Sequence, residues 1–259
     1  MQRSFITLIA LAAFGLSGCA TGPTPIQLRQ AQTHRDLADL KLSQGELGFA
    51  VREYKASIEM NPHDAEAHFG LGEALRRRGM LPEAEKHFTI ASKMDEMHDD
   101  ARFNLGVVYI QQERWADAIA LNTRLAENPT FLRPERALVN RGWALYKSGD
   151  LPGAKRDFQE VLAGNSADFH SHLNLGIVLY EQGETLQAMV HFERVLKLVD
   201  RRPNGAAGGL AAQARFHLAQ AHVKLGQRDQ AIRQLERASE QGGSGEWAAK
   251  SRAYLSVLQ

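Results

Sequence analysis

The sequence predicts an all-α protein: a right-handed superhelical solenoid of six helix hairpins closed by a capping helix. Two series of small residues, which share one spacing, carry this prediction. The first series has spacings of 34, 34, 36, 34 and 43 residues: Ala38, Gly72, Gly106, Gly142, Gly176 and Ala219. The second series keeps the same spacings: Ala50, Ala84, Ala118, Ala154, Ala188 and Ala231. Self-similarity at such a period is the signature of stacked repeats.

Each period has the size of one helix, a short turn and a second helix. Small residues belong where two helix backbones approach closely. A large aromatic residue follows four members of the second series after four positions: Tyr54, Phe88, Phe158 and Phe192. One hairpin cannot bury its apolar stripe alone, so neighbouring repeats stack and share a core. Five glycines fall where a first helix must end and favour a left-handed cap: Gly45, Gly79, Gly149, Gly183 and Gly226.

The third repeat departs from this pattern. Glu113 stands where the other repeats have the turn glycine, and Asn122 stands where most have the aromatic residue. We expect this repeat to pack more loosely than its neighbours.

The hairpins follow one another along the chain with two interruptions. The predicted repeats span 31–64, 65–98, 99–132, 135–168, 169–202 and 212–245, followed by a capping helix over 246–259. Arg133 and Pro134 form a short insertion, and residues 203–211 form a longer one rich in Gly and Ala. Because repeats contact only their neighbours, residues 31–245 are expected to form one solenoid.

The Leu-Gly pair on the first helix and the Ala-x3-Phe spacing on the second resemble the tetratricopeptide repeat (TPR) signature. This resemblance implies a protein-binding scaffold with a concave groove. Three first helices carry extra apolar residues at offsets that generally face such a groove. These residues form the predicted partner-binding surface: Phe103, Val107, Ile110, Val139, Trp143, Tyr146, Leu173, Ile177 and Tyr180. An exposed apolar patch of this extent marks a binding surface. The alternative is that tight curvature or the chain's own linker buries them.

The N-terminal residues predict export and lipidation. Arg3 precedes an apolar stretch over 5–16, and Leu16-Ser17-Gly18-Cys19 follows. This order is typical of a secretory signal peptide, over 1–18, and the last four residues resemble a bacterial lipobox. Lipidated Cys19 and a linker would then occupy 19–30. Ala20 after the Cys suggests the outer membrane, with the protein facing the periplasm. The alternative is an uncleaved anchor with an incidental cysteine.

Composition argues against several classes of function. Residues 1–18 contain one Arg and no acidic residue, so the remaining chain has 30 basic and 30 acidic residues. This balance gives no electrostatic reason to expect nucleic acid. The histidines lack metal-ligand spacing, and Cys19 is the single cysteine. No phosphate loop or Ser-His-Asp set is visible. The sequence therefore predicts neither an enzyme, a cofactor nor a small-molecule substrate.

A lipobox followed by six repeats resembles the TPR-type pilotins of type IV pili, the PilF/PilW lipoproteins and the social-motility lipoprotein Tgl. The likeness is greatest at Pro134-Glu135-Arg136, which opens the fourth repeat, and continues through Gly142 and the segment 154–158. The resemblance implies an outer-membrane lipoprotein that binds secretin subunits and promotes assembly of the pilus pore. The alternative is a lipid-anchored TPR adaptor that scaffolds envelope hydrolases or outer-membrane protein assembly factors.

Overall fold

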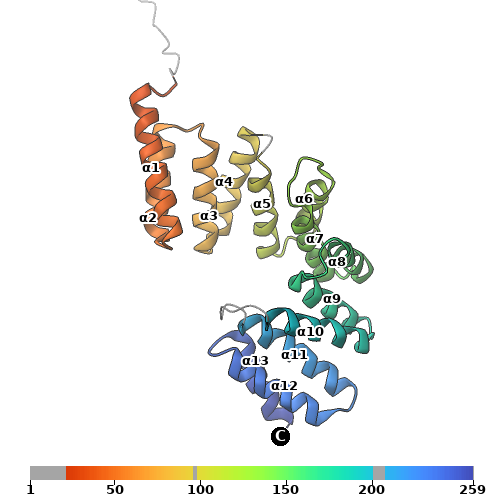
Figure 1. Ribbon diagram of the computed structural model, residues 1–259. Coiled ribbons are helices and arrows are strands. Elements are labelled where there is room, and N and C mark those ends of the chain that lie inside the picture. The colour runs from red at the N-terminus through yellow and green to blue at the C-terminus, as the bar shows by residue number, and fades with distance from the viewer. Residues whose placement is uncertain (1–21, 96–97, 201–207, 259) are drawn as a thin grey trace, which may run out of the picture.

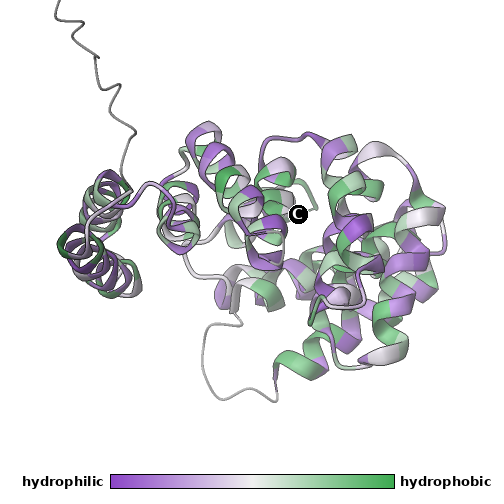
Figure 2. Ribbon diagram, turned by 90° about the horizontal axis from the view of Figure 1, so that it is seen from above, coloured by the Kyte–Doolittle hydropathy of each residue, from purple (hydrophilic) through white to green (hydrophobic). Residues whose placement is uncertain are grey.

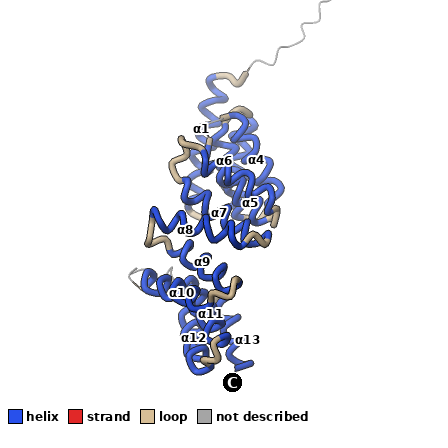
Figure 3. Tube along the Cα trace, turned by 90° about the vertical axis from the view of Figure 1, so that its right-hand side faces the viewer, coloured by secondary structure: helices blue, strands red, loops and turns tan. Residues whose placement is uncertain are grey.

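The computed structural model describes residues 22–95, 98–200 and 208–258. This part of the chain consists of helices joined by short loops and contains no strand, so the predicted all-α class is confirmed (Figures 1 and 3). The helices, in chain order, are α1 (Pro25–Ser43), α2 (Leu47–Met60), α3 (Ala65–Arg77), α4 (Leu81–Met94), α5 (Asp99–Gln111), α6 (Trp115–Glu127), α7 (Pro134–Ser148), α8 (Leu151–Gly164), α9 (Phe169–Glu181), α10 (Thr185–Val199), α11 (Gly208–Lys224), α12 (Arg228–Gln241) and α13 (Glu246–Leu258).

Consecutive helices pair into six antiparallel hairpins, from α1–α2 to α11–α12. Each second helix packs between the first helix of its own hairpin and that of the next, and α13 packs against α11 and α12 where the capping helix was predicted. Successive first helices also contact one another along the whole array, from α1–α3 to α11–α13. The first helices therefore lie side by side on the inner side of a curved array. The axis along which the hairpins stack changes direction between α5 and α10 (Figure 1). Hydrophilic and hydrophobic residues are mixed on the helices, as expected for amphipathic elements (Figure 2).

The glycines at the hairpin turns adopt the predicted left-handed conformation. Their φ angles lie between +72° and +94°: Gly45, Gly79, Gly149, Gly183 and Gly226. Glu113 occupies the equivalent position in the third repeat and has a φ of 58°. A side chain in this region is strained by contact between its Cβ and the carbonyl oxygen that follows. The backbone geometry of the turn is thus kept even where the sequence lacks glycine.

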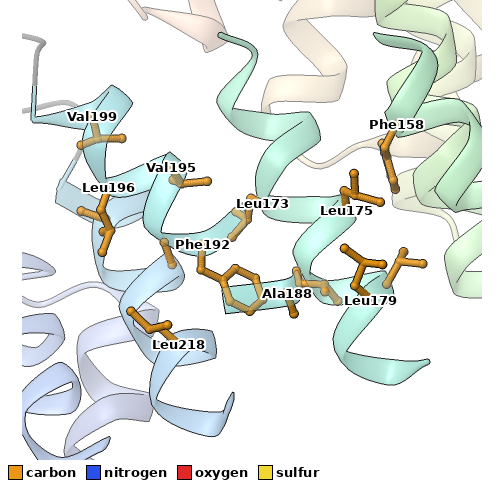
Figure 4. Packing of buried hydrophobic residues seen from close by; sticks show 14 of the residues in the cluster. Phe158, Leu173, Leu175, Leu179, Ala188, Phe192, Val195, Leu196, Val199 and Leu218 are labelled. Atoms are coloured by element: carbon orange, nitrogen blue, oxygen red, sulfur yellow. The ribbon is translucent and has the colours of Figure 1, made fainter. Parts of the chain in front are cut away.

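Close contact between a glycine and an aromatic ring fixes the two helices of a hairpin. A Cβ placed on Gly176 would lie 2.5 Å from Cε1 of Phe192, a distance too short for a real contact. Gly72 and Gly142 face Phe88 and Phe158 in the same way. Phe192 is fully buried among side chains from α8 to α11 (Figure 4). In the third repeat the side chain below Gly106 is Asn122, whose Nδ2 donates a hydrogen bond to the carbonyl of Ala118 over 2.8 Å.

In several hairpins a polar residue on the first helix contacts a polar residue on the second helix that follows it by 19 positions in the sequence. Nδ1 lies 2.9 Å from Nδ1 in two histidine pairs, His68–His87 and His172–His191, in the second and fifth repeats. Burial, followed by the charge of the partner ring, lowers the pKa of His87 and of His191 to about 4. These rings are therefore neutral in the folded protein at pH 7.

Two predicted boundaries are corrected. Helix α1 begins at Pro25, inside the segment 19–30 predicted as a linker, because Thr24 and Gln27 form a capping box. Helix α11 begins at Gly208, inside the predicted insertion over 203–211. Residues 1–18, Cys19 and residues 203–207 lie outside the described residues. Among the described helices, none is both long and apolar enough to cross a membrane.

Candidate functional site

A groove opens on the inner side of the array, between the first helices of the middle repeats. Its volume is about 570 Å³, and we call it the concave groove. Side chains from α3, α5, α7, the C-terminal part of α8 and the start of α9 line it: Arg76, Phe103, Asn104, Val107, Glu135, Arg136, Val139, Asn140, Val161, Asp168 and His170. Its central walls are thus α5 and α7, which are the first helices of the third and fourth repeats.

The apolar part of the groove consists of Phe103, Val107, Val139 and Val161. Phe103 is only 6% exposed, because the guanidinium carbon of Arg136 lies 4.5 Å from its ring centroid and Phe131 lies behind it at 6.3 Å. A cation above an aromatic face is held by the ring quadrupole. Arg136 therefore covers the phenyl ring and places a positive charge at the edge of the groove.

The polar part of the groove combines balanced charges with two asparagine amides. Arg76 forms two hydrogen bonds of 2.9 Å with Glu73. Asn104 Nδ2 donates to the carbonyl of Asp100 over 3.0 Å. Nδ2 of Asn140 is buried and has no acceptor among the described residues. A buried donor without a partner costs free energy, so this amide is suited to donate to a ligand.

The predicted partner-binding residues divide into three groups. Phe103, Val107 and Val139 line the concave groove. Four others are half-buried on the same helices: Ile110, Trp143, Tyr146 and Tyr180. Leu173 and Ile177 depart from the expectation of an open stripe, since they are 2% and 7% exposed and belong to the core between α8 and α11.

Trp143 and Tyr146 form a second cluster, one to two turns beyond Val139 on α7. Their ring centroids are 5.3 Å apart, and Nζ of Lys147 lies 5.9 Å from the rings of both Trp143 and Trp115. Burial raises the pKa of Tyr146, so its phenol stays neutral. The cluster is a half-exposed aromatic surface, the side-chain type that dominates binding energy at protein interfaces.

The sequence interpretation missed Asn104, Asn140 and Arg136. The asparagines carry a signal that was available: Asn104, Asn140 and Asn174 keep the 36- and 34-residue spacing of Gly106, Gly142 and Gly176. The signal is weak beside that of the small and apolar residues, because asparagine occurs at this position in only three of the six repeats. Arg136 carries no such signal, since its contact with Phe103 depends on how α5 and α7 pack.

The lining of the groove combines charges of both signs with amides. Arg76 and Arg136 stand with Glu135 and Asp168 in the lining, and the Nδ2 of Asn140 is buried there without an acceptor among the described residues. Among the described residues, no three His, Cys, Asp or Glu side chains are grouped to hold a metal ion. The groove offers a partner apolar contacts, amide hydrogen bonds and charges of both signs.

Comparison with known proteins identifies the repeat. Two family models described as tetratricopeptide repeat match the chain, one at residues 35–91 and again at 77–130, the other at residues 168–241. The chain belongs to the tetratricopeptide repeat family. The matched residues cover well over half of the chain and fall in both halves of the TPR array.

Among solved structures, PilW, described as a widely conserved type IV pilus biogenesis factor, aligns with a TM-score of 0.73 and 16% identity over 85% of this chain and 97% of its own. PilF of Pseudomonas aeruginosa aligns with a TM-score of 0.68 and 16% identity over 88% of this chain and 99% of its own. The expected resemblance to these TPR proteins is confirmed for the fold. A TPR protein of Parabacteroides merdae is similarly close, with a TM-score of 0.67 and 15% identity, over 88% of this chain and 84% of its own.

Curated relatives match this chain over a part of their length. Human protein O-mannosyl-transferase TMTC3 is 24% identical over 169 residues, which are 63% of this chain and 18% of TMTC3. Cellulose synthase operon protein C of Komagataeibacter xylinus is 30% identical over 141 residues, which are 51% of this chain and 10% of that protein. The chain spans less than a third of the length of the curated relatives it matches.

Proposed function

We propose that this TPR protein is a pilotin: an outer-membrane lipoprotein that faces the periplasm, binds secretin subunits and promotes assembly of the type IV pilus pore. The single observation that carries the proposal is the alignment with PilW and PilF, which extends over nearly all of both proteins and 85% or more of this chain. Both alignments extend over the array and not over a few repeats alone, so a complete pilus biogenesis factor of the same fold supports the proposal.

The concave groove supports a role in binding without turnover. Its apolar floor, amides and balanced charges can hold a segment of a partner, whereas a chemical step would need convergent titratable groups. Half-exposed aromatic side chains on α7 and α9 extend the apolar surface beyond the groove. We therefore place the secretin on the inner side of the array, with Trp143 near the centre of the interface.

Membrane attachment in this proposal depends on Cys19. Two or more acyl chains anchor a protein stably, at about 0.8 kcal/mol for each buried CH₂. Cys19→Ser should release a folded protein into the periplasmic fraction, because the TPR array does not use the anchor. A Cys19→Ser protein that still fractionates with the outer membrane contradicts the lipid anchor.

Secretin binding is tested by co-purification from detergent-solubilised envelopes. Val139→Glu adds a charge to the floor of the groove, and Leu186→Glu adds the same charge to an exposed apolar residue on α10. The wild type and Leu186→Glu should retain the secretin, and Val139→Glu should lose it at a temperature well below its own melting temperature, which is measured because Val139 also packs against the core. Capture of an envelope hydrolase or assembly factor in place of the secretin would favour the adaptor role instead.

Truncation of the aromatic side chains gives a second test. Trp143→Ala and Tyr180→Ala should each weaken secretin binding by about thirtyfold or more, as for central interface aromatics, which contribute about 2 kcal/mol. If melting temperature and binding fall together, these rings are core residues and the secretin binds elsewhere.

A further inference from the structure

The outer face of α1, at the N-terminal end of the array, is apolar and exposed (Figure 1). Its residues recur at steps of four and three positions, which keep them on one side of the helix: Ile26, Gln30, Thr33, Leu37 and Leu40. The three apolar side chains among them are 70%, 40% and 52% exposed. None of the five residues is charged, and we call them the end stripe.

The same positions of the next first helix form a helix–helix interface. The last three residues of the end stripe correspond, 34 positions further along the chain, to residues of α3 that are 0–1% exposed: Ala67, Leu71 and Ala74. Helix α2 packs against α3, and the ring of Tyr54 lies against Gly70, which is about one turn from Ala67 and from Ala74. The end stripe therefore has the position of a helix-docking surface, but its side chains remain exposed.

The two ends of the array differ. At the C-terminal end, α13 packs against α11 and α12, and three of its side chains lie on the core of the last hairpin: Tyr254, Leu255 and Leu258. At the N-terminal end, the end stripe takes the place of the polar outer face that a terminal repeat needs for solubility. Clustered exposed apolar side chains mark an interaction site.

We propose that the end stripe binds the end stripe of a second copy of this chain, in an antiparallel α1–α1 pair about a two-fold axis at Thr33. In such a pair, residues equally far from Thr33 meet, so Ile26 contacts Leu40 of the partner subunit. The interface is isologous, and this contact therefore forms twice. Thr33 is small, which lets the two helices approach closely where they cross.

The charges beside the end stripe fit this orientation. Arg29 and Asp36 are seven residues apart, about two helical turns, and so lie on the same edge of the stripe. An antiparallel pair places Arg29 opposite Asp36 of the partner subunit, whereas a parallel pair would place like charges opposite each other. An anionic lipid surface fits less well, because it would repel Asp36.

The dimer leaves the binding side of the array open. The concave groove is lined from α3 to α9, so α1 contributes no residue to it. A single helix pair is smaller than the standard stable interface of about 800 Å² for each partner, so we expect a weak dimer. The inference does not rest on the proposed function, although an anchor at Cys19 would raise the effective concentration of the two copies.

Disulfide trapping tests the pairing in the full chain carrying Cys19→Ser, in which each introduced cysteine is the single one. Thr33→Cys should form a disulfide-linked dimer under mild oxidation, because residue 33 meets itself on the axis. Leu40→Cys should not, since its two copies would lie about 20 Å apart, and a disulfide needs Cα atoms within about 7 Å. A mixture of Ile26→Cys and Leu40→Cys proteins should form the mixed dimer. Equal rates of maleimide labelling control for thiol reactivity.

Substitutions in the Thr33→Cys protein test the contacts. Adding Leu40→Glu should lower the disulfide yield by about tenfold, because it buries a charge in the apolar interface. Adding Leu186→Glu, at an exposed apolar residue on α10, is the matched control and should leave the yield unchanged. Arg29→Glu should lower the yield, and Arg29→Glu with Asp36→Arg should restore it. The melting temperature should hold in each variant, since these side chains are exposed.

The dimer is refuted if Thr33→Cys forms no disulfide, if Leu40→Cys alone forms as much, or if Leu40→Glu leaves the yield unchanged. If Thr33→Cys stays monomeric and Leu40→Glu releases the protein from vesicles of phosphatidylethanolamine and phosphatidylglycerol, a lipid surface covers the end stripe and the dimer is wrong. If the chain dimerises but captures no secretin, the dimer stands and the pilotin role is wrong. If it captures the secretin without forming the disulfide, the pilotin role stands and the dimer is wrong.

Discussion

Gly176→Ala tests whether glycine in the first series is required by the ring beneath it. The added Cβ would lie 2.5 Å from Cε1 and 2.8 Å from Cδ1 of Phe192. Phe192 is 0% exposed and is enclosed by side chains from four helices, so the ring cannot move aside freely (Figure 4). Overpacking of this kind costs about 1–3 kcal/mol. The higher helix propensity of Ala recovers about 1 kcal/mol, which leaves a net loss of about 1 kcal/mol.

The sixth repeat supplies the compensating change. Ala219 stands at the position of Gly176 there, and Leu235 stands at the position of Phe192. Phe192→Leu alone should destabilise by about 1–2 kcal/mol because it leaves a cavity. Gly176→Ala combined with Phe192→Leu should be more stable than the sum of the single effects by about 1 kcal/mol, since the smaller side chain makes room for the methyl group.

Urea unfolding followed by circular dichroism measures these effects, together with melting temperatures. A loss of 1 kcal/mol corresponds to about 2–4 °C for a chain of this size. Gly164→Ala, where a Cβ meets no atom within 4 Å, is the control and should not destabilise. The reasoning is refuted if Gly176→Ala is as stable as wild type, or if the two substitutions at 176 and 192 are additive.

Three other predictions concern single interactions. Arg141→Ala should lower the unfolding free energy by about 3 kcal/mol, because the 4% exposed carboxylate of Asp157 loses the two hydrogen bonds of 2.7 and 2.8 Å that Arg141 donates. In urea unfolding, the double variant Arg141→Met with Asp157→Leu should recover most of this loss, and a double variant as unstable as Arg141→Ala would contradict the role of the unpaired charge. The melting temperature should fall as pH drops from 6.5 towards 4, because the pKa of His87 and of His191 is lowered to about 4 in the folded protein, so the unfolded chain binds protons at a higher pH. The fall in melting temperature should be smaller when both histidines are replaced by Gln, and a double variant with the pH profile of the wild type would contradict the prediction. Glu113→Gly should raise stability by about 1 kcal/mol by relieving the φ of 58°, and a lower melting temperature would show that the side chain offsets the strain.

The sequence predicted the fold because the strongest packing constraints repeat. Gly72, Gly142 and Gly176 must be small since an aromatic ring lies within 3 Å of the missing Cβ, and this requirement recurs in three of the hairpins. The N-terminal boundary was wrong for a different reason. Thr24, Pro25 and Gln27 form a recognisable helix start, yet the prolines on either side of Thr24 were interpreted as a stiff linker. A helix-start signal of this kind occurs once in the chain, so no equivalent residues in other repeats support the prediction of that boundary.

The predicted binding surface was only partly open, and the reason lies between repeats. Val107 and Ile177 are both apolar and each stands one residue after the glycine of its first helix. Val107 lines the concave groove, while Ile177 is buried with side chains from α8 to α11. A helical stripe shows which side chains share a face but not how closely the next repeat covers that face. That distance depends on the curvature of the whole array, which no single repeat determines.

Two asparagines show that an unsatisfied amide does not by itself identify a binding site. Asn122 replaces an aromatic residue, is fully buried, and donates to the carbonyl of Ala118 beneath Gly106, while its Oδ1 has no donor among the described residues. Asn140 is the converse case, because its Nδ2 has no acceptor among the described residues. The two differ in place: Asn122 lies between the two helices of one hairpin, where the free energy of the unpaired oxygen is lost to the fold, whereas Asn140 lines the concave groove, where a bound partner can reach its amide.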